Sequence, residues 1–321
     1  MRILIVTPAP PRSRKGNRVT AVRWSRILRS LGHAVAIAEE YKRQRCDLLV
    51  ALHALRSYPA IERFRRLHPA LPLIVTLTGT DLYGDIRTDE RARRSLDLAD
   101  ALIVLQPKGI EDLPESVRAK TRVIYQSIRR PPDLREPRQG IWEICVIGHL
   151  RPVKDPFRAA EASRLLPASS RIEILHIGGA LSDDMELRAR RESAANPRYR
   201  WLGELPRWRA IRALARCRAL VLSSEMEGGA HVVGEALACG IPVLATDIPG
   251  SVGLLGESYP GYFPVGDTRA LSELLLRSET DSCFYADLKR RCEALAALVD
   301  PVREAESWDD LLADLSAPDT A

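Results

Sequence analysis

Short apolar runs alternate with longer amphipathic stretches along this chain. Residues 3–6 read Ile-Leu-Ile-Val, and residues 19–31 then carry apolar side chains at helical spacing before Gly32. A continuous apolar run of this length is typical of a parallel strand that is buried on both faces, and the amphipathic stretch predicts a helix lying against the sheet. The opening of the chain therefore predicts a strand–helix unit.

Such units recur in two series. Further β-type runs occupy residues 34–38, 48–52, 73–77, 101–105 and 123–126 in the first series, and residues 141–147, 172–177, 200–202, 220–222 and 241–245 in the second. Alternating strands and helices favour parallel sheets with helices on both faces. The predicted fold class is α/β, with two Rossmann-like, doubly wound parallel-sheet domains.

The segment 129–140 is rich in proline and charged residues, which is typical of a linker. We therefore assign residues 1–137 to an N-terminal domain and residues 138–300 to a C-terminal domain. Residues 301–321 form a third part, because Trp308, Leu311 and Leu312 share one face of a predicted helix.

Polar residues follow several predicted strands of the first domain. Doubly wound sheets bind ligands beyond the carboxyl ends of their strands, and a basic glycine-containing loop at a helix start favours an anion. The candidate binding residues are Gly16, Asn17 and Arg18 after the first strand, His53 after the third, and Thr78, Gly79, Thr80 and Asp81 after the fourth. A solvated arginine loop and a structural histidine are the alternatives.

In the second domain, residues 227–245 combine two acids, a glycine pair and a helix start. Glu227 and Glu235 have seven residues between them, and the predicted helix ends at Gly240. Glycines let backbone N–H groups approach an oxygen-rich ligand, a helix N-terminus favours anions, and each carboxylate can accept two hydroxyl donors. The stretch suits a sugar nucleotide, and acids that only interact with the helix dipole are the alternative.

Two basic residues, Arg151 and Lys154, follow the first strand of the second domain. Together with Gly148 they can straddle the two phosphates of a nucleoside diphosphate and offset the charge of a leaving group. Glycine-containing turns also follow the next two strands, at Gly178-Gly179 and at Gly203-Glu204-Leu205. A solvated lysine before a helix is the plainer explanation for Lys154.

Composition narrows the possible partners. The 321 residues suffice for two cores, and the net charge of +6 comes with only 5% aromatic residues and scattered arginines, which argues against nucleic-acid binding. The six cysteines contain no C-x-x-C pair, so we expect reduced thiols. Because no apolar run is long enough for a signal peptide or a membrane span, we expect a cytoplasmic protein without a membrane partner.

Residues 227–245 as a whole resemble the Glu-x7-Glu signature of retaining GT-B glycosyltransferases of the family-4 type. The resemblance implies two facing domains with the active site in the cleft between them, and a terminal helix that packs back on the first domain. It also implies that Glu227 holds the transferred sugar and Glu235 the ribose of the donor.

Residues 148–154 resemble the Gly-Arg-Leu-x-x-x-Lys element of the same family, with His149 in place of the usual arginine, so that Arg151 is the candidate to supply the missing charge. The resemblance thus assigns catalytic roles to Arg151, Lys154 and Glu227. The donor-binding residues it implies are Gly148, Arg151, Lys154, Gly178, Leu205, Glu227, Gly228, Gly229, Ala230, His231, Val232, Val233 and Glu235.

The sequence contains no D-x-D tripeptide, so a metal clamp on the diphosphate has no obvious ligands. We expect neither a metal nor a cofactor, with Lys154, Arg151 and helix-terminal amides balancing the charge of the leaving diphosphate. Many relatives also carry histidine where this chain has Thr78. Since a hydroxyl of ordinary acidity is a poor general base, we expect an acceptor that is already ionised.

A closer likeness concerns the selenosugar synthases of selenoneine biosynthesis. It rests on Gly-Asn-Arg-Val-Thr-Ala at residues 16–21, Leu-Thr-Gly-Thr-Asp-Leu-Tyr at 77–83 and Ser-Glu-Met-Glu-Gly-Gly-Ala-His-Val at 224–232. This resemblance implies UDP-GlcNAc or UDP-glucose as donor, selenophosphate as acceptor, and hand-over of the product to other enzymes of that pathway.

The residues themselves imply only an anionic acceptor. Transfer to an alcohol, lipid or polysaccharide stays open, and so does a non-catalytic sugar-nucleotide-binding protein. The choice between retention and inversion at the anomeric carbon is open as well, because Thr78 departs from the family pattern.

Overall fold

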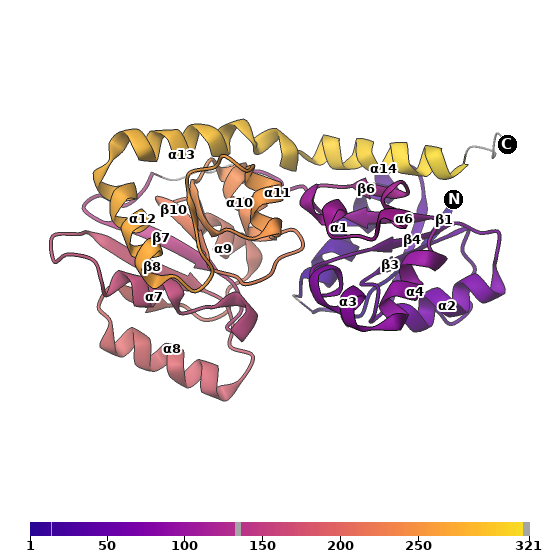
Figure 1. The fold of residues 1–321 in the computed structure, drawn as a ribbon, viewed down its shortest axis with the longest axis horizontal. Helices are drawn as coiled ribbons and strands as arrows, with labels where there is room; N and C mark the ends of the chain where they lie inside the picture. The colour runs from indigo at the N-terminus through magenta and orange to yellow at the C-terminus, as the bar shows by residue number, and fades with distance from the viewer. Residues whose placement is uncertain (14, 132–135, 317–321) are drawn as a thin grey trace. The chain divides into compact units, whose positions relative to one another are not determined.

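The computed structural model of this chain describes residues 1–13, 15–131 and 136–316. It contains two compact units, one formed by Met1–Gln126 together with Pro301–Ala321 and the other by Ser127–Asp300. Each unit is built on a six-stranded parallel sheet with helices packed against it (Figure 1). The prediction of two Rossmann-like α/β domains is confirmed.

The first sheet has the strand order β2-β1-β3-β4-β5-β6. Its strands are β1 (Arg2–Val6), β2 (Ala34–Ala38), β3 (Leu48–Leu52), β4 (Leu73–Thr76), β5 (Ala101–Val104) and β6 (Thr121–Val123). The helices of this unit are α1 (Gly16–Ser30), α2 (Tyr58–Leu67), the π-helical turn η1 (Asp81–Asp85), α3 (Ile86–Thr88), α4 (Glu90–Leu98), α5 (Lys108–Glu111), α6 (Glu115–Arg118) and α14 (Pro301–Ser316).

The second sheet has the order β12-β11-β10-β7-β8-β9. Its strands are β7 (Trp142–Ile147), β8 (Ile172–Ile177), β9 (Tyr199–Trp201), β10 (Ala219–Leu222), β11 (Val243–Thr246) and β12 (Tyr262–Phe263). The helices are η2 (Pro152–Lys154), α7 (Arg158–Ser163), α8 (Asp183–Ala195), α9 (Arg207–Leu214), α10 (His231–Cys239), α11 (Pro249–Leu255), α12 (Thr268–Thr280), α13 (Ser282–Ala294) and η3 (Ala296–Val299).

Three details differ from the sequence-based expectation. Helix α1 begins at Gly16 and not near Val19, so the predicted anion loop is itself the first helical turn. The short edge strand β12 was not predicted, because a strand of two residues leaves no recognisable apolar run. The division between the units follows Gln126, before the proline-rich linker, because the Ile128 N–H already donates to the Val299 carbonyl (2.9 Å).

Each sheet has one point at which the strand order reverses. This point lies between β1 and β3 in the first sheet and between β10 and β7 in the second. The loops that leave two neighbouring strands there turn to opposite faces of the sheet, so they leave room for a ligand at its carboxyl edge. We therefore expect ligand-binding residues in the loops after β1, β3, β7 and β10.

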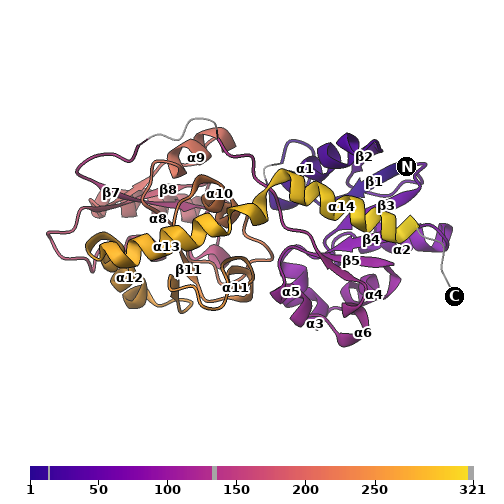
Figure 2. The same cartoon turned by 90° about the horizontal axis from the view of Figure 1, so that it is seen from above.

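Helix α14 completes the core of the first unit. Its Trp308 is fully buried against Trp24 of α1, with ring centroids 4.9 Å apart in an edge-to-face arrangement. Glu304 is 2% exposed, and its Oε1 accepts hydrogen bonds from Trp24 Nε1 (2.7 Å) and Arg23 Nε (3.1 Å). Figure 2 shows this helix crossing over the first unit, as expected for the terminal helix.

Replacement of Trp308 with Ala should lower the free energy of unfolding of the first unit by about 3–5 kcal/mol, because it removes a fully buried aromatic side chain. Urea unfolding followed by circular dichroism measures this. Val302→Ala on the same helix is the control, since the Val302 side chain is 63% exposed. Equal unfolding curves for the two variants would contradict the role given to α14.

Candidate functional site

The loops after β7, β8 and β9 lie backbone against backbone. A Cβ atom added to Gly178 would lie 1.8 Å from the carbonyl oxygen of Gly148, so only glycine fits there. The Leu150 N–H donates to the Gly179 carbonyl (2.9 Å), and the Gly178 N–H donates to the Gly203 carbonyl (2.8 Å). The three glycine turns identified in the sequence are thus brought together at one edge of the sheet.

A buried histidine lies beneath these loops. His176 has Nε2 3.2 Å from the Gly148 carbonyl oxygen and Nδ1 2.8 Å from the Tyr199 hydroxyl. A carbonyl oxygen can only accept, so Nε2 carries the proton and Nδ1 accepts from Tyr199. Burial lowers the pKa of His176 to about 4, which keeps the ring neutral. Sequence reasoning missed this residue, although a histidine inside an apolar strand is a usable signal.

Glu227 lies in the loop after β10 and is held on one side only. Its Oε1 pairs with the Lys154 ammonium and accepts a hydrogen bond from Ser224 Oγ (2.7 Å). Among the described residues no hydrogen bond to Oε2 is found. Ser223 Oγ lies 2.8 Å from the Asp155 carbonyl oxygen and ties η2 to the same loop. The structure therefore unites Lys154 and Glu227 and leaves one carboxylate oxygen for a ligand hydroxyl.

Gly250, at the start of α11, supports Glu227 from behind. A Cβ atom at this position would lie 2.0 Å from the Glu227 carbonyl oxygen. The backbone of α11 therefore packs directly on the residue that carries the acid. Sequence analysis did not single out Gly250, because a Pro-Gly pair is an ordinary turn signal.

Glu235 lies on α10 and is 6% exposed. Its Oε1 accepts a hydrogen bond from Arg207 Nε (2.9 Å). Ala230 is the N-cap of the helix and provides no side-chain cap. The Val233 N–H donates to the Ala230 carbonyl (2.9 Å), and the partial positive charge at the start of the helix favours an anion there. This turn contains His231, Val232 and Val233, and it directly follows Gly228 and Gly229.

Three other donor-side residues have no described side-chain contact with Lys154 or Glu227. Arg151 is exposed, and none of the described interactions joins its side chain to Lys154 or Glu227. His149 has a buried Nδ1 atom with no hydrogen-bond partner among the described residues. Leu205 lines a cavity next to α9 that neither Glu227 nor Glu235 lines.

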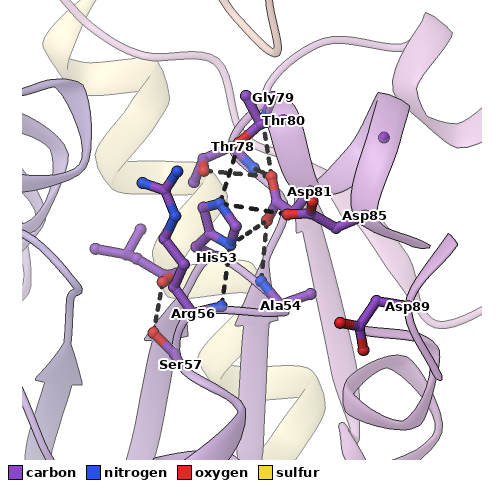
Figure 3. A network of polar contacts seen from close by, with 12 residues as sticks. His53, Ala54, Arg56, Ser57, Thr78, Gly79, Thr80, Asp81, Asp85 and Asp89 are labelled. Carbon is purple, nitrogen blue, oxygen red and sulfur yellow. Dashed lines mark hydrogen bonds and ion pairs between the residues drawn. The ribbon is translucent and has the colours of Figure 1, made fainter. Parts of the chain in front are cut away.

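In the first unit, Asp81 organises the loop after β4 (Figure 3). It is fully buried, its Oδ1 accepts from the N–H groups of Thr78 (2.8 Å) and Gly79 (2.9 Å), and its Oδ2 accepts from the Ala54 N–H (2.9 Å). We expected Asp81 among the acceptor-binding residues. Its carboxylate is instead used by backbone amides, so it shapes the loop that presents Thr78 and Thr80.

His53 joins this loop to β3. It is 2% exposed and has a φ of 80°, which is uncommon for a residue other than glycine. Nδ1 accepts from the Arg56 N–H (3.2 Å), so Nε2 carries the proton and donates to Thr80 Oγ1 (3.1 Å). Burial lowers the pKa of His53. The exposed Thr80 hydroxyl is then left to donate its own hydrogen outward.

The residues Gly16, Asn17 and Arg18 form the first turn of α1, which has no acidic residue and no side-chain cap. No described carboxylate lies within ion-pairing distance of Arg18. β1 and β3 are neighbours, so this turn follows the strand next to the one that carries His53. No described hydrogen bond joins the turn to His53 or to the Thr78 loop, and the structure therefore shows two separate polar features at this sheet edge.

Comparison with known proteins decides the family. The sequence profile described as "Glycosyl transferases group 1" matches residues 135–295, half of the chain. This chain belongs to the group 1 glycosyltransferases. The matched region contains every residue that we assigned to donor binding, from Gly148 to Glu235.

Solved structures of other glycosyltransferases share the fold of this enzyme. Sucrose-phosphate synthase from Thermosynechococcus elongatus superposes with a TM-score of 0.77 at 16% identity, over 98% of each chain. HepE from Anabaena in complex with UDP-glucose gives a TM-score of 0.77 at 16% identity, over 98% of this chain and 100% of its own. The lipopolysaccharide galactosyltransferase WaaB gives 0.70 at 12% identity, over 98% and 99%. The fold is GT-B.

Two features are absent from the described residues of this glycosyltransferase. No group of three or more His, Cys, Asp or Glu side chains is arranged to hold a metal ion. No helix in residues 1–13, 15–131 and 136–316 combines the length and apolar character needed to cross a bilayer. Five of the six cysteines are buried, Cys283 is exposed, and all are free thiols.

Replacement of Gly250 with Ala should lower the rate of sugar transfer about 100-fold, because the new methyl group displaces the Glu227 backbone by a distance that catalysis does not tolerate. Initial-rate measurements with saturating donor test this. Val252→Ala is the control, since it removes atoms from the same helix and adds none. Wild-type rates for Gly250→Ala would show that the packing of α11 on Glu227 has no catalytic importance.

The neutral state of His176 predicts a loss of stability in acid. Its folded pKa of about 4 lies below its ordinary value of 6.5, so the unfolded chain binds more protons between these values. The free energy of unfolding should therefore fall by about 3 kcal/mol as pH decreases through this window. Denaturant titrations of wild type and His176→Gln at several pH values isolate this contribution, because the variant lacks the group. Parallel pH profiles would contradict the assignment.

Proposed function

We propose that this glycosyltransferase transfers a hexose, GlcNAc or glucose, from a UDP-sugar to selenophosphate and releases UDP. The donor half of the proposal is supported by the group of Lys154, Glu227 and the N-terminus of α10, which offers a cation, a carboxylate oxygen and backbone amides at one sheet edge. The UDP-glucose complex of HepE, which has the same fold, agrees with such a donor.

Each donor-side group has a distinct chemical task in this proposal. Glu227 Oε2 accepts a hydroxyl of the transferred sugar, and Glu235, fixed by Arg207, accepts the ribose hydroxyls. Lys154 and the first-turn amides of α10 bind the diphosphate and stabilise the charge that develops on it as the sugar departs. Arg151, in the same loop as Lys154, adds a further positive charge to this site. No metal is needed for this charge balance.

The acceptor half rests on one observation, which is that neither His53, after β3, nor Asp81, in the loop after β4, offers a free base to an alcohol. Both ring nitrogens of His53 are engaged, and the Asp81 carboxylate is held by backbone amides. Thr78 occupies the position at which many relatives carry histidine. A nucleophile that is ionised before it binds needs no base.

Selenophosphate fits the groups that remain. Its negative charges match Arg18 and the uncapped first turn of α1, and the Thr80 hydroxyl can donate a further hydrogen bond. In the transfer step the selenium atom attacks the anomeric carbon and a C–Se bond forms. The bond from that carbon to the diphosphate oxygen breaks, and UDP leaves with the electron pair.

Incubation of the enzyme with UDP-GlcNAc and selenophosphate should yield UDP and a hexose product with the selenium isotope pattern. Mass spectrometry detects the product, and a coupled assay measures UDP. Lys154→Ala should lose most of the UDP release, because the leaving diphosphate loses its cation. Glu235→Ala should chiefly weaken UDP binding, whereas Glu227→Ala should chiefly slow transfer. Added EDTA should leave the rate unchanged.

The outcomes separate the candidate functions. Transfer to sugar alcohols or polysaccharides but not to selenophosphate would replace the acceptor, and in that case Asp85, whose carboxylate lies 3.7 Å from His53 Nε2, is the remaining base to test by Asp85→Asn. UDP that raises the melting temperature without any donor turnover would overturn the enzymatic proposal.

A further inference from the structure

A cavity of about 470 Å³ in the second unit is lined mainly by arginines. It lies beside α9 and next to the edge strand β9, and none of Lys154, Glu227 and Glu235 contributes to its wall. Its volume is within the range of about 300–1,000 Å³ that is usual for small-molecule sites. The charged residues in its wall are Arg138, Glu143, Arg200, Arg209, Arg212 and Arg216.

The positive charge of this wall is only partly balanced. Glu143 is 2% exposed, and its Oε1 pairs with Arg200 (3.0 Å) and Arg138 (3.7 Å). Its Oε2 lies 3.7 Å from the Cys217 thiol, which can donate a weak hydrogen bond. One carboxylate thus faces five guanidinium groups.

Arg209 and Arg216 have no carboxylate partner among the residues that the structure describes. The Nε–H of Arg216 is also buried without a hydrogen-bond acceptor among the described residues. A buried donor without an acceptor is costly, and the excess of guanidinium groups over carboxylates in this wall points to an anionic ligand. Planar guanidinium groups match the oxygens of phosphate groups in particular, because they can donate two parallel hydrogen bonds.

We propose that this cavity, the arginine cavity, binds a small molecule with two or more phosphate groups at a second site separate from the nucleotide-sugar site. Several phosphates on one ligand match an excess of cations that a single phosphate would leave unbalanced. Leu175 and Leu205 also line the wall, and their apolar side chains form no hydrogen bonds. The arginines are therefore the main hydrogen-bond donors in the cavity. This site is independent of the identity of the sugar acceptor.

Isothermal titration of the full-length enzyme with tripolyphosphate tests the proposal. We expect binding that persists in saturating UDP and that is about tenfold weaker in Arg209→Gln/Arg216→Gln, since the variant loses charge-assisted hydrogen bonds. Arg209→Lys/Arg216→Lys keeps the charge but loses the paired donors, so its affinity should lie between the two. Thermal unfolding confirms that each variant is folded.

The matched control is Arg190→Gln/Arg269→Gln, which removes the same charge from two exposed positions outside the cavity. Its affinity should equal that of wild type. If the control and the cavity variant lost affinity for tripolyphosphate to the same extent, binding would depend only on the overall positive charge of the protein. That result would overturn the proposal. Displacement of tripolyphosphate by UDP would also overturn it, because the anion would then occupy the nucleotide site. Loss of selenosugar formation alone would leave this inference intact.

Discussion

The donor side of this enzyme depends on two places where backbone packs on backbone without an intervening side chain. Gly178 meets the carbonyl of Gly148, and Gly250 meets the carbonyl of Glu227. These contacts fix the loops after β7 and β10, which leave the two strands at the point where the strand order reverses. Lys154 and Glu227 come from these two loops, so their pairing follows from how closely the main chains approach.

Both units use a buried, neutral histidine to hold a loop at the carboxyl edge of the sheet. The Nε2–H of His176 donates to the Gly148 carbonyl, and the Nε2–H of His53 donates to the Thr80 hydroxyl. In both cases burial is the largest influence on the ring and lowers its pKa. A charged ring would have to donate from Nδ1 as well. In His53 this nitrogen faces the Arg56 N–H, which can only donate, so the geometry there requires the neutral ring.

Periodicity and motif spacing predict most strands and the family of this protein, but they miss several residues of the candidate sites. Continuous apolar runs predicted nearly every strand, because parallel strands are buried on both faces, and the Glu-x7-Glu spacing led to the correct family. A sequence does not tell whether a carboxylate faces a ligand or backbone amides, so the contacts of Asp81 with backbone N–H groups could not be predicted. Gly250, His176 and the arginine cavity were missed, because they depend on residues that come together only in three dimensions.

Helix α14 brings the end of the chain into the core of the unit in which the chain begins, while the second unit is one continuous segment. During synthesis the second unit can therefore complete its core before the first, because Trp308 and its helix are translated after the whole of the second unit. The sheet that is translated first is left with Trp24 and Leu28 uncovered in the meantime. This apolar face therefore stays exposed to other chains until α14 has been translated.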